Sequence, residues 1–400
     1  MESNRIIMDS DLSRDAAEQA PKRNYGIDLL RVLSMLYVVM LHTLGRGGAL
    51  NAASKGTIQY QVSWFLEIWA YGAVDIFALI SGYVAFSPKA KRTNYSKYIM
   101  LWMQVVFYSL GVTLVYRVLY PDLVTKGEII RQVFPFTNDL YWYFSAYTAL
   151  FVIMPVLNAG IRKCSEEYLS KLFVLMILVF SVYNTFVKRF HFNNGYSFLW
   201  ITLLYILGAI MKKCKIGENI KGYQSILIII LCAVITWAWR LYGITAELTS
   251  EIEITKSMLV NYTSPMVLIS AIFHIILFSK MKFKNISQKI ISFMGAGAFS
   301  VYILNCQICV WKYIMKDRFK YLGQSNPMTI VIHTLAFSAA FVICAILIDS
   351  VRRWLFKGFR ANVVADLIAA IVDKVVSLPI ARKYRRKEVQ GESVENVLSE

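Results

Sequence analysis

The sequence has few charged residues, little acid and almost no histidine. Asp, Glu, Lys and Arg make up 17% of the 400 residues, only 25 residues are acidic, and there are four histidines. A soluble domain usually carries about 25% charged residues, which cover its surface. The sparse charge therefore argues against a soluble globular protein.

Several familiar motifs of enzymes and metalloproteins are also missing. The chain contains no P-loop, no dinucleotide-binding fingerprint, no zinc-ligand spacing and no serine elbow. Its six cysteines show no pattern of a secreted disulfide framework. Cys306 and Cys309 form a C-x-x-C, but they lie in an apolar run, where thiols act as small hydrophobic groups. We therefore expect neither a metal site nor a disulfide.

What the sequence does contain is hydrophobic residues in long runs. They make up 57% of the chain, and the mean hydropathy is +0.50. A helix needs about 20 apolar residues to cross a bilayer. The pattern predicts an all-α, polytopic membrane bundle of about ten transmembrane helices, at 27–45, 63–86, 98–119, 139–158, 169–187, 197–211, 223–243, 261–279, 290–311 and 328–350.

The net charge of +18 could indicate a nucleic-acid-binding protein, but the positions of the basic residues favour a membrane protein. Basic residues fall in alternate loops, and the positive-inside rule then predicts a multi-pass cell-membrane protein with both termini in the cytoplasm. The loop at 312–327 disagrees, because its basic residues would face outward. The agreeing clusters are Lys89, Lys91, Arg92 and Lys97; Arg162 and Lys163; Lys212, Lys213, Lys215 and Lys221; Lys280, Lys282, Lys284 and Lys289.

The two ends of the chain differ from the apolar middle. We expect a polar cytoplasmic tail at 1–22, one membrane domain at 23–350, and a loose tail at 388–400. Between them, residues 351–387 predict a basic amphipathic helix that lies in the membrane interface and contacts anionic lipids. Its apolar stripe is formed by Phe356, Phe359, Val363, Leu367, Ile371 and Val375.

The first apolar run carries three ionisable residues on one face. At about 100° per residue, Arg31 and His42 are eleven steps apart and return to within roughly 20° of each other. Asp28 is three residues before Arg31 and lies on the same side. Ionisable groups are costly in hydrocarbon, so this stripe indicates a functional site. The alternatives are a histidine that only packs helices and an Asp28–Arg31 ion pair that only orders the bundle.

The second run supplies further polar candidates. Glu67 enters the membrane at about the depth predicted for His42, and a carboxylate beside an imidazole would fix its tautomer. Asp75 lies deeper in the membrane, and it is either a direct participant in the chemistry or a packing residue. At the inner end, Ser81 and Gly82 are small enough to let a neighbouring backbone or a ligand come close.

These residues resemble the opening motifs of the acyltransferase family 3 membrane proteins. The first motif is Asp28, Arg31 and His42, and the second runs from Gly72 to Tyr83. Trp142 through Pro155 is similar to a later family stretch, and Phe299 through Leu304 to another. There the sequence departs from the family, because Asn305 stands where a histidine is usual.

The resemblance implies a two-sided enzyme that needs no metal. Acetyl-CoA would approach from the cytoplasm, and the acceptor would be a hydroxyl of an extracytoplasmic or lipid-linked glycan. His42 would be the general base or part of an acyl relay, with Arg31, Asp28, Glu67 and Asp75 as further catalytic candidates. Arg31, Ser81, Lys89 and Arg92 would bind the donor, since phosphates need cationic groups.

Two other kinds of function use the same features. A transporter or flippase could line its path with the same polar stripe, although the chain shows no inverted repeat. A membrane domain of this family type could also only recognise an amino acid or a peptidoglycan precursor. Aromatic residues offer a possible carbohydrate platform at Tyr141, Trp142, Tyr143 and Tyr147.

Overall fold

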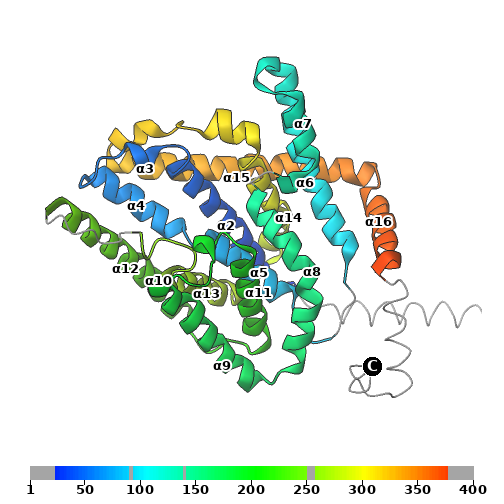
Figure 1. The fold of residues 1–400 in the computed structure, drawn as a ribbon, viewed down its shortest axis with the longest axis horizontal. Helices are drawn as coiled ribbons and strands as arrows, with labels where there is room; N and C mark the ends of the chain where they lie inside the picture. Colours follow the sequence, from blue (N-terminus) through cyan, green and yellow to red (C-terminus); the bar gives the residue numbers. More distant parts are fainter. Residues whose placement is uncertain (1–22, 90–92, 138–140, 250–256, 377–400) are drawn as a thin grey trace, which may run out of the picture.

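The computed structural model describes residues 23–89, 93–137, 141–249 and 257–376, and these ranges form helices without any strand (Figure 1). The predicted tails 1–22 and 388–400 and the candidate Arg92 lie outside the described residues. The longer helices are α2 (Tyr25–Leu44), α4 (Ile58–Ala70), α5 (Ala73–Ala85), α6 (Tyr95–Leu119), α8 (Trp142–Lys163), α9 (Glu166–Ile177), α11 (Phe198–Lys213), α12 (Gly222–Thr249), α13 (Pro265–Ser279), α14 (Asn285–Asn305), α15 (Pro327–Gly358) and α16 (Ala361–Val376).

The all-α membrane class is confirmed, but fewer helices than predicted are long enough to cross. In the described part of the chain, seven helices are long and apolar enough to span a bilayer, or eight if one broken pair forms a single span. The predicted spans at 197–211 and 261–279 fall on α11 and α13, which have 16 and 15 residues. Both are shorter than the roughly 20 residues that a full crossing needs.

Helix α2 lies at the centre of the bundle. It begins at Asn24, whose side chain accepts a hydrogen bond from the Ile27 amide at 3.1 Å and so caps the first turn. Its side chains Leu30, Val39 and Leu44 are completely buried. The helix packs against α4, α5, α13, α14 and α15, so groups along it can meet residues from most of the bundle.

Helices α5 and α11 approach each other closely through two glycines. A Cβ atom at Gly82 would lie 1.9 Å from the Tyr205 carbonyl oxygen, and one at Gly208 would lie 2.1 Å from the Leu79 carbonyl oxygen. Only glycine fits at such distances. The prediction that Gly82 lets a neighbouring backbone come close is confirmed, and the neighbour is α11.

The basic loops gather at one end of the bundle, opposite His42. The Asn24 side-chain amide donates to the Ser279 carbonyl at 2.7 Å, which joins the start of α2 to the end of α13. Lys213 donates to the Ile161 carbonyl at 2.8 Å, and Lys280 donates to the Gly217 carbonyl at 2.7 Å. The loops that carry these lysines therefore lie together at one end of the bundle.

The region after residue 350 differs from the single amphipathic helix that the sequence predicts. Helix α15 continues through residue 350 to Gly358, and the chain then turns into α16 (Figure 1). Ala365 and Ala369 pack against Ile99 of α6, while Val363 and Leu367 remain exposed. Residues 377–387 lie outside the described part of the chain. Attachment of α16 to anionic lipids stays a prediction.

A buried polar cluster joins α15 to α6. The Asp349 carboxylate, which has no exposed surface, accepts hydrogen bonds from Tyr108 at 2.9 Å, Gln104 at 3.2 Å and Arg352 at 2.8 Å. Arg353 lies 3.1 Å from the other carboxylate oxygen. Several donors around one buried carboxylate stabilise it in an apolar surrounding.

Candidate functional site

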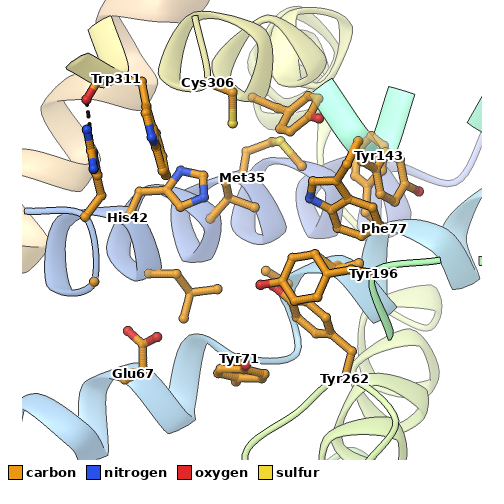
Figure 2. A pocket seen from close by; sticks show the side chains of 18 of the residues that line it. Met35, His42, Glu67, Tyr71, Phe77, Tyr143, Tyr196, Tyr262, Cys306 and Trp311 are labelled. Carbon is orange, nitrogen blue, oxygen red and sulfur yellow. Dashed lines mark hydrogen bonds between the residues drawn. The ribbon is translucent and has the colours of Figure 1, made fainter. Parts of the chain in front are cut away.

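A cavity of about 340 Å³ lies beside His42, at the end of α2 away from the basic loops (Figure 2). Met35, Val38, His42 and Gly45 of α2 line one side of it, because they follow one another at helical spacing. Glu67 and aromatic side chains from other segments line the rest. The face that the sequence singled out therefore opens into an enclosed space.

The imidazole of His42 is held by Asn305, the last residue of α14. The Asn305 side-chain oxygen contacts the His42 Nδ1 atom, and Asn305 is fully buried. An amide oxygen only accepts hydrogen bonds, so Nδ1 must carry the proton. This leaves Nε2 as the ring nitrogen with a free lone pair, which is the form that a general base needs.

Trp311 and Arg46 complete the surroundings of the imidazole. The Trp311 ring meets the His42 ring edge-on, with 4.8 Å between centroids and an interplanar angle of 87°. The Arg46 guanidinium lies 5.3 Å from the Trp311 ring centroid, and its Nε donates to the Trp311 carbonyl at 3.2 Å. Arg46 and His42 both line the cavity, so the two side chains face the same space.

The two residues that contact His42 come from opposite sides of a break in the chain. Helix α14 ends at Asn305, and the next helical segment, from Val310 to Gln324, leaves at an angle of 71°. Gln307 fills the break: its side-chain oxygen accepts from the Cys309 amide at 2.7 Å, and its nitrogen donates to Thr113 at 2.7 Å. The backbone groups exposed by the break are thereby satisfied inside the protein.

The segment that the charge pattern could not orient packs at the His42 end. The Phe319 amide donates to the Gly47 carbonyl at 2.8 Å, and the Asp317 amide donates to the Arg46 carbonyl at 3.1 Å. Lys312 forms an ion pair of 3.0 Å with Glu128 of α7 (Lys126–Val133). The 312–324 segment thus covers the end of α2 next to the cavity.

Glu67 lines the same cavity as His42, but it is not the hydrogen-bond partner of the imidazole. Asn305 occupies that position. The Glu67 side chain is only 8% exposed, and its Oε2 atom has no hydrogen-bond partner among the described residues. The sequence suggested that this carboxylate fixes the tautomer of His42. In the structure, the Asn305 amide contacts the imidazole instead.

Asp75 and Ser81 face other parts of the structure. The Asp75 carboxylate is completely buried and accepts a hydrogen bond from the Trp200 indole of α11 at 3.1 Å. The Ser81 hydroxyl donates to the Phe77 carbonyl of its own helix at 3.0 Å. Neither residue lines the cavity beside His42.

Asp28 and Arg31 lie near the other end of α2. Fourteen residues separate Asp28 from His42, which is about 21 Å along a helix. The buried Asp28 carboxylate pairs with both Arg31 and Arg23, one on each oxygen. The structure therefore joins Asp28 to Arg31 as predicted and keeps both apart from the imidazole.

A basic groove lies at the end of the bundle where Asp28 is found. Arg23, Lys289 and Arg353 line it, together with Asn285 and Ser292. Lys89 is exposed in the loop after α5 and is not among the groove residues. Several cationic side chains around an open groove suit an anionic ligand.

The sequence missed the residues whose role depends on distant contacts. It identified Trp142 and Tyr143 as a possible platform, and both line the cavity, whereas Tyr196 and Tyr262 come from loops without a motif. Arg46 was detectable, because it lies one turn after His42. Across the described residues, no group of three or more His, Cys, Asp or Glu side chains is arranged to hold a metal ion.

A comparison with protein families gives one match that covers most of the chain. The model of a family described as an acyltransferase domain matches residues 24–349. That range runs from the cap of α2 into α15 and includes the cavity, His42 and Asn305. No curated protein and no solved structure matches the chain.

Proposed function

The chain belongs to the acyltransferase family 3, as a membrane acyltransferase, and from that premise we propose that it transfers an acetyl group from acetyl-CoA to a glycan hydroxyl. The observation that carries the proposal is the His42–Asn305 contact at the edge of a cavity large enough for a ligand. Ligand sites in proteins usually have volumes of about 300–1,000 Å³.

His42 acts as the general base in this proposal. Its Nε2 takes the proton of the acceptor hydroxyl while the oxygen attacks the thioester carbonyl carbon. A C–O bond forms, the C–S bond breaks, and the CoA thiolate leaves and takes up a proton. Asn305 is a positioning residue, since it holds Nδ1 in the protonated form through the cycle.

The donor approaches from the basic end of the bundle, which we assign to the cytoplasm. The phosphates of acetyl-CoA would lie in the groove between Arg23, Lys289 and Arg353. We place Arg31 and Asp28 along the route, because about 21 Å of α2 separates that end from His42. A pantetheine arm of similar length brings the thioester to the cavity.

The acceptor binds at the other end, outside the cytoplasm. Aromatic side chains line that part of the cavity, among them Trp142 and Tyr143. Aromatic rings offer apolar faces together with a polar edge, which suits the mixed surface of a sugar. We propose a cell-envelope or exported polysaccharide, or its lipid-linked precursor, as the source of the hydroxyl.

Acetyl transfer can be measured directly in membranes that contain the protein. Radiolabelled acetyl-CoA is added on the cytoplasmic side, and label is followed into envelope glycans for the wild type and for His42→Ala at equal expression. We expect label with the wild type and its loss with His42→Ala. His333→Ala is the matched control, because His333 is exposed, lies outside the cavity and hydrogen-bonds the exposed Tyr321.

Two results would contradict the proposal in different ways. Label that survives His42→Ala removes His42 as the base while leaving an acyltransferase. If the wild type transfers no label from any acyl-CoA, the transferase proposal is wrong. A carrier that uses the same polar residues is then favoured.

A further inference from the structure

Glu67 is a buried acid in the cavity whose second oxygen has nothing to bind. Its side chain is 8% exposed, and Oε2 lacks a hydrogen-bond partner among the described residues. Arg240 acts on it electrostatically but makes no hydrogen bond to Oε2, and the Arg240 Nε atom also lacks a hydrogen-bond partner among the described residues. The Arg240 guanidinium donates to the Tyr60 hydroxyl at 2.6 Å and lies 3.1 Å from the Trp64 ring centroid.

Aromatic rings gather next to this carboxylate. Tyr71 follows Glu67 at the end of α4, and Tyr262 lies 5.0 Å from both Tyr71 and Tyr196 between ring centroids. The Trp142 ring lies 4.8 Å from the Tyr196 ring. Tyr71, Tyr196 and Tyr262 line the same cavity as Glu67. Figure 2 shows them grouped along the part of the cavity away from Trp311.

This combination has a definite chemical preference. The faces of aromatic rings carry negative electrostatic potential and attract cations, and a carboxylate does so more strongly. A hydroxyl would satisfy the hydrogen bond of Oε2, and only a cationic partner would also stabilise the ionised form of the buried acid. A protonated amine does both.

We propose that the cavity binds an acceptor that carries a protonated amine, held between Glu67 and the rings of Tyr71, Tyr196 and Tyr262. The inference deepens the proposed function and rests on it, because only a transferase has an acceptor. His42 lies across the cavity from Glu67 (Figure 2), and Arg46 lies beside Trp311, whose ring contacts His42. Because the Arg46 charge repels an amine, the acceptor enters with its amine toward Glu67 and a hydroxyl toward His42.

Calorimetric titration of the purified full chain in lipid nanodiscs tests the preference. The probes are D-glucosamine, D-glucose and N-acetyl-D-glucosamine, which differ in the charge at one position. We expect D-glucosamine to bind at least about tenfold more tightly than the other two, as a charge-assisted hydrogen bond provides. Glu67→Gln should bring the three affinities together.

Glu167→Gln is the matched control, because it removes an exposed carboxylate of α9, outside the cavity. It should keep the preference for D-glucosamine. Thermal unfolding verifies that Glu67→Gln is folded. If Glu67→Gln does not fold, Tyr262→Leu replaces it as the variant expected to lose the preference for D-glucosamine. The ratio of the affinities measured for the wild type then tests the proposal without any variant.

The outcomes separate this inference from the proposed function. Equal affinities in the wild type, a preference that survives Glu67→Gln, or no measurable binding of D-glucosamine would each overturn it. Titration of His42→Ala should give the wild-type preference, since that substitution stops the reaction and not the binding. If acetyl transfer is observed but the cavity does not prefer D-glucosamine, the proposed transferase function is retained. Only the proposal of an amine-bearing acceptor is then rejected.

Discussion

The Asn305 side-chain oxygen contacts the His42 Nδ1 atom across 263 residues of sequence. Asn305 is the last residue of α14, and His42 lies in the last turn of α2, so the packing of these two helices sets the geometry of the base. The asparagine stands at a position where the family usually has a histidine. In this chain Asn305 contacts His42, the candidate base, and does not take over its role.

Substitution of Asn305 should affect the rate of transfer more than the binding of substrates. Asn305→Leu removes the acceptor for Nδ1–H, and we expect kcat to fall by about 10²-fold with little change in KM for the donor. Asn305→Asp keeps an acceptor oxygen and should recover most of the rate. Steady-state kinetics of the three proteins check this. Equal rates for the Leu and Asp variants would contradict a positioning role.

The Asp28 carboxylate should contribute to stability through its two arginines. Asp28→Leu leaves Arg23 and Arg31 without their shared partner, and we expect a loss of about 1–2 kcal/mol. The value is modest because the two arginine side chains keep 48% and 27% of their surface exposed. Thermal unfolding should show a midpoint lower by a few degrees. An unchanged midpoint with a raised KM for acetyl-CoA would instead assign the residue to donor binding.

The crossing of α5 and α11 should tolerate no side chain at its glycines. Gly208→Ala introduces a Cβ that would lie 2.1 Å from the Leu79 carbonyl, so the helices must separate. We expect a cost of about 1–3 kcal/mol or failure to accumulate in membranes. Gly111→Ala in α6 is the matched control, because a Cβ there meets nothing within 4 Å. It should leave the unfolding midpoint unchanged or raise it.

The basic groove should control the affinity for the donor and not the chemical step. Lys289→Ala removes a groove cation that is exposed to water. We expect KM for acetyl-CoA to rise about three- to tenfold while kcat stays the same, and the effect to shrink at high salt. Lys171→Ala, at an exposed ion pair of α9, should change neither constant. A fall in kcat alone would contradict donor binding in the groove.

The contact between α7 and the 312–324 segment should weaken in acid. The Thr125 amide, which donates to Glu128, and the Lys312 ammonium hold the pKa of the Glu128 carboxyl below its ordinary value of 4.5. A carboxyl whose pKa is lowered by folding stabilises the folded contact above its unfolded pKa, and that contribution is lost as the pH falls through the folded pKa.

Limited proteolysis of α7 measures this effect. Cleavage should be slow at neutral pH and should accelerate only below about pH 4.5. Glu128→Gln should be cleaved at the faster rate over the whole range. A rise in cleavage near pH 7 in the wild type would point to another group.

Hydrophobic runs and helix periodicity were sufficient to predict much of this structure. The helical class, the face of α2 that carries His42, and the close approach at Gly82 all follow from local pattern, because helix geometry relates neighbouring residues directly. The number of spans was less accurate, since the apolar runs at α11 and α13 were counted as full crossings although these helices have only 16 and 15 residues.

The partners of the site residues could not be predicted in the same way. Glu67 and Asn305 both lie near His42, and only the packing of α14 against α2 decides that the amide, not the carboxylate, binds Nδ1. Asp75 illustrates the same limit, because its partner Trp200 is 125 residues away. Spacing along one helix reveals a shared face, but contacts between helices depend on the whole fold.

The break after Asn305 has a consequence for genetics. Asn305 and Trp311 contact His42 from the two sides of the break, so the position of the base depends on how the segment up to Gln324 is packed. Random mutagenesis that selects for loss of acetylation should therefore recover substitutions in this segment. Such alleles would look catalytic in an activity assay, although most of the altered side chains lie outside the cavity.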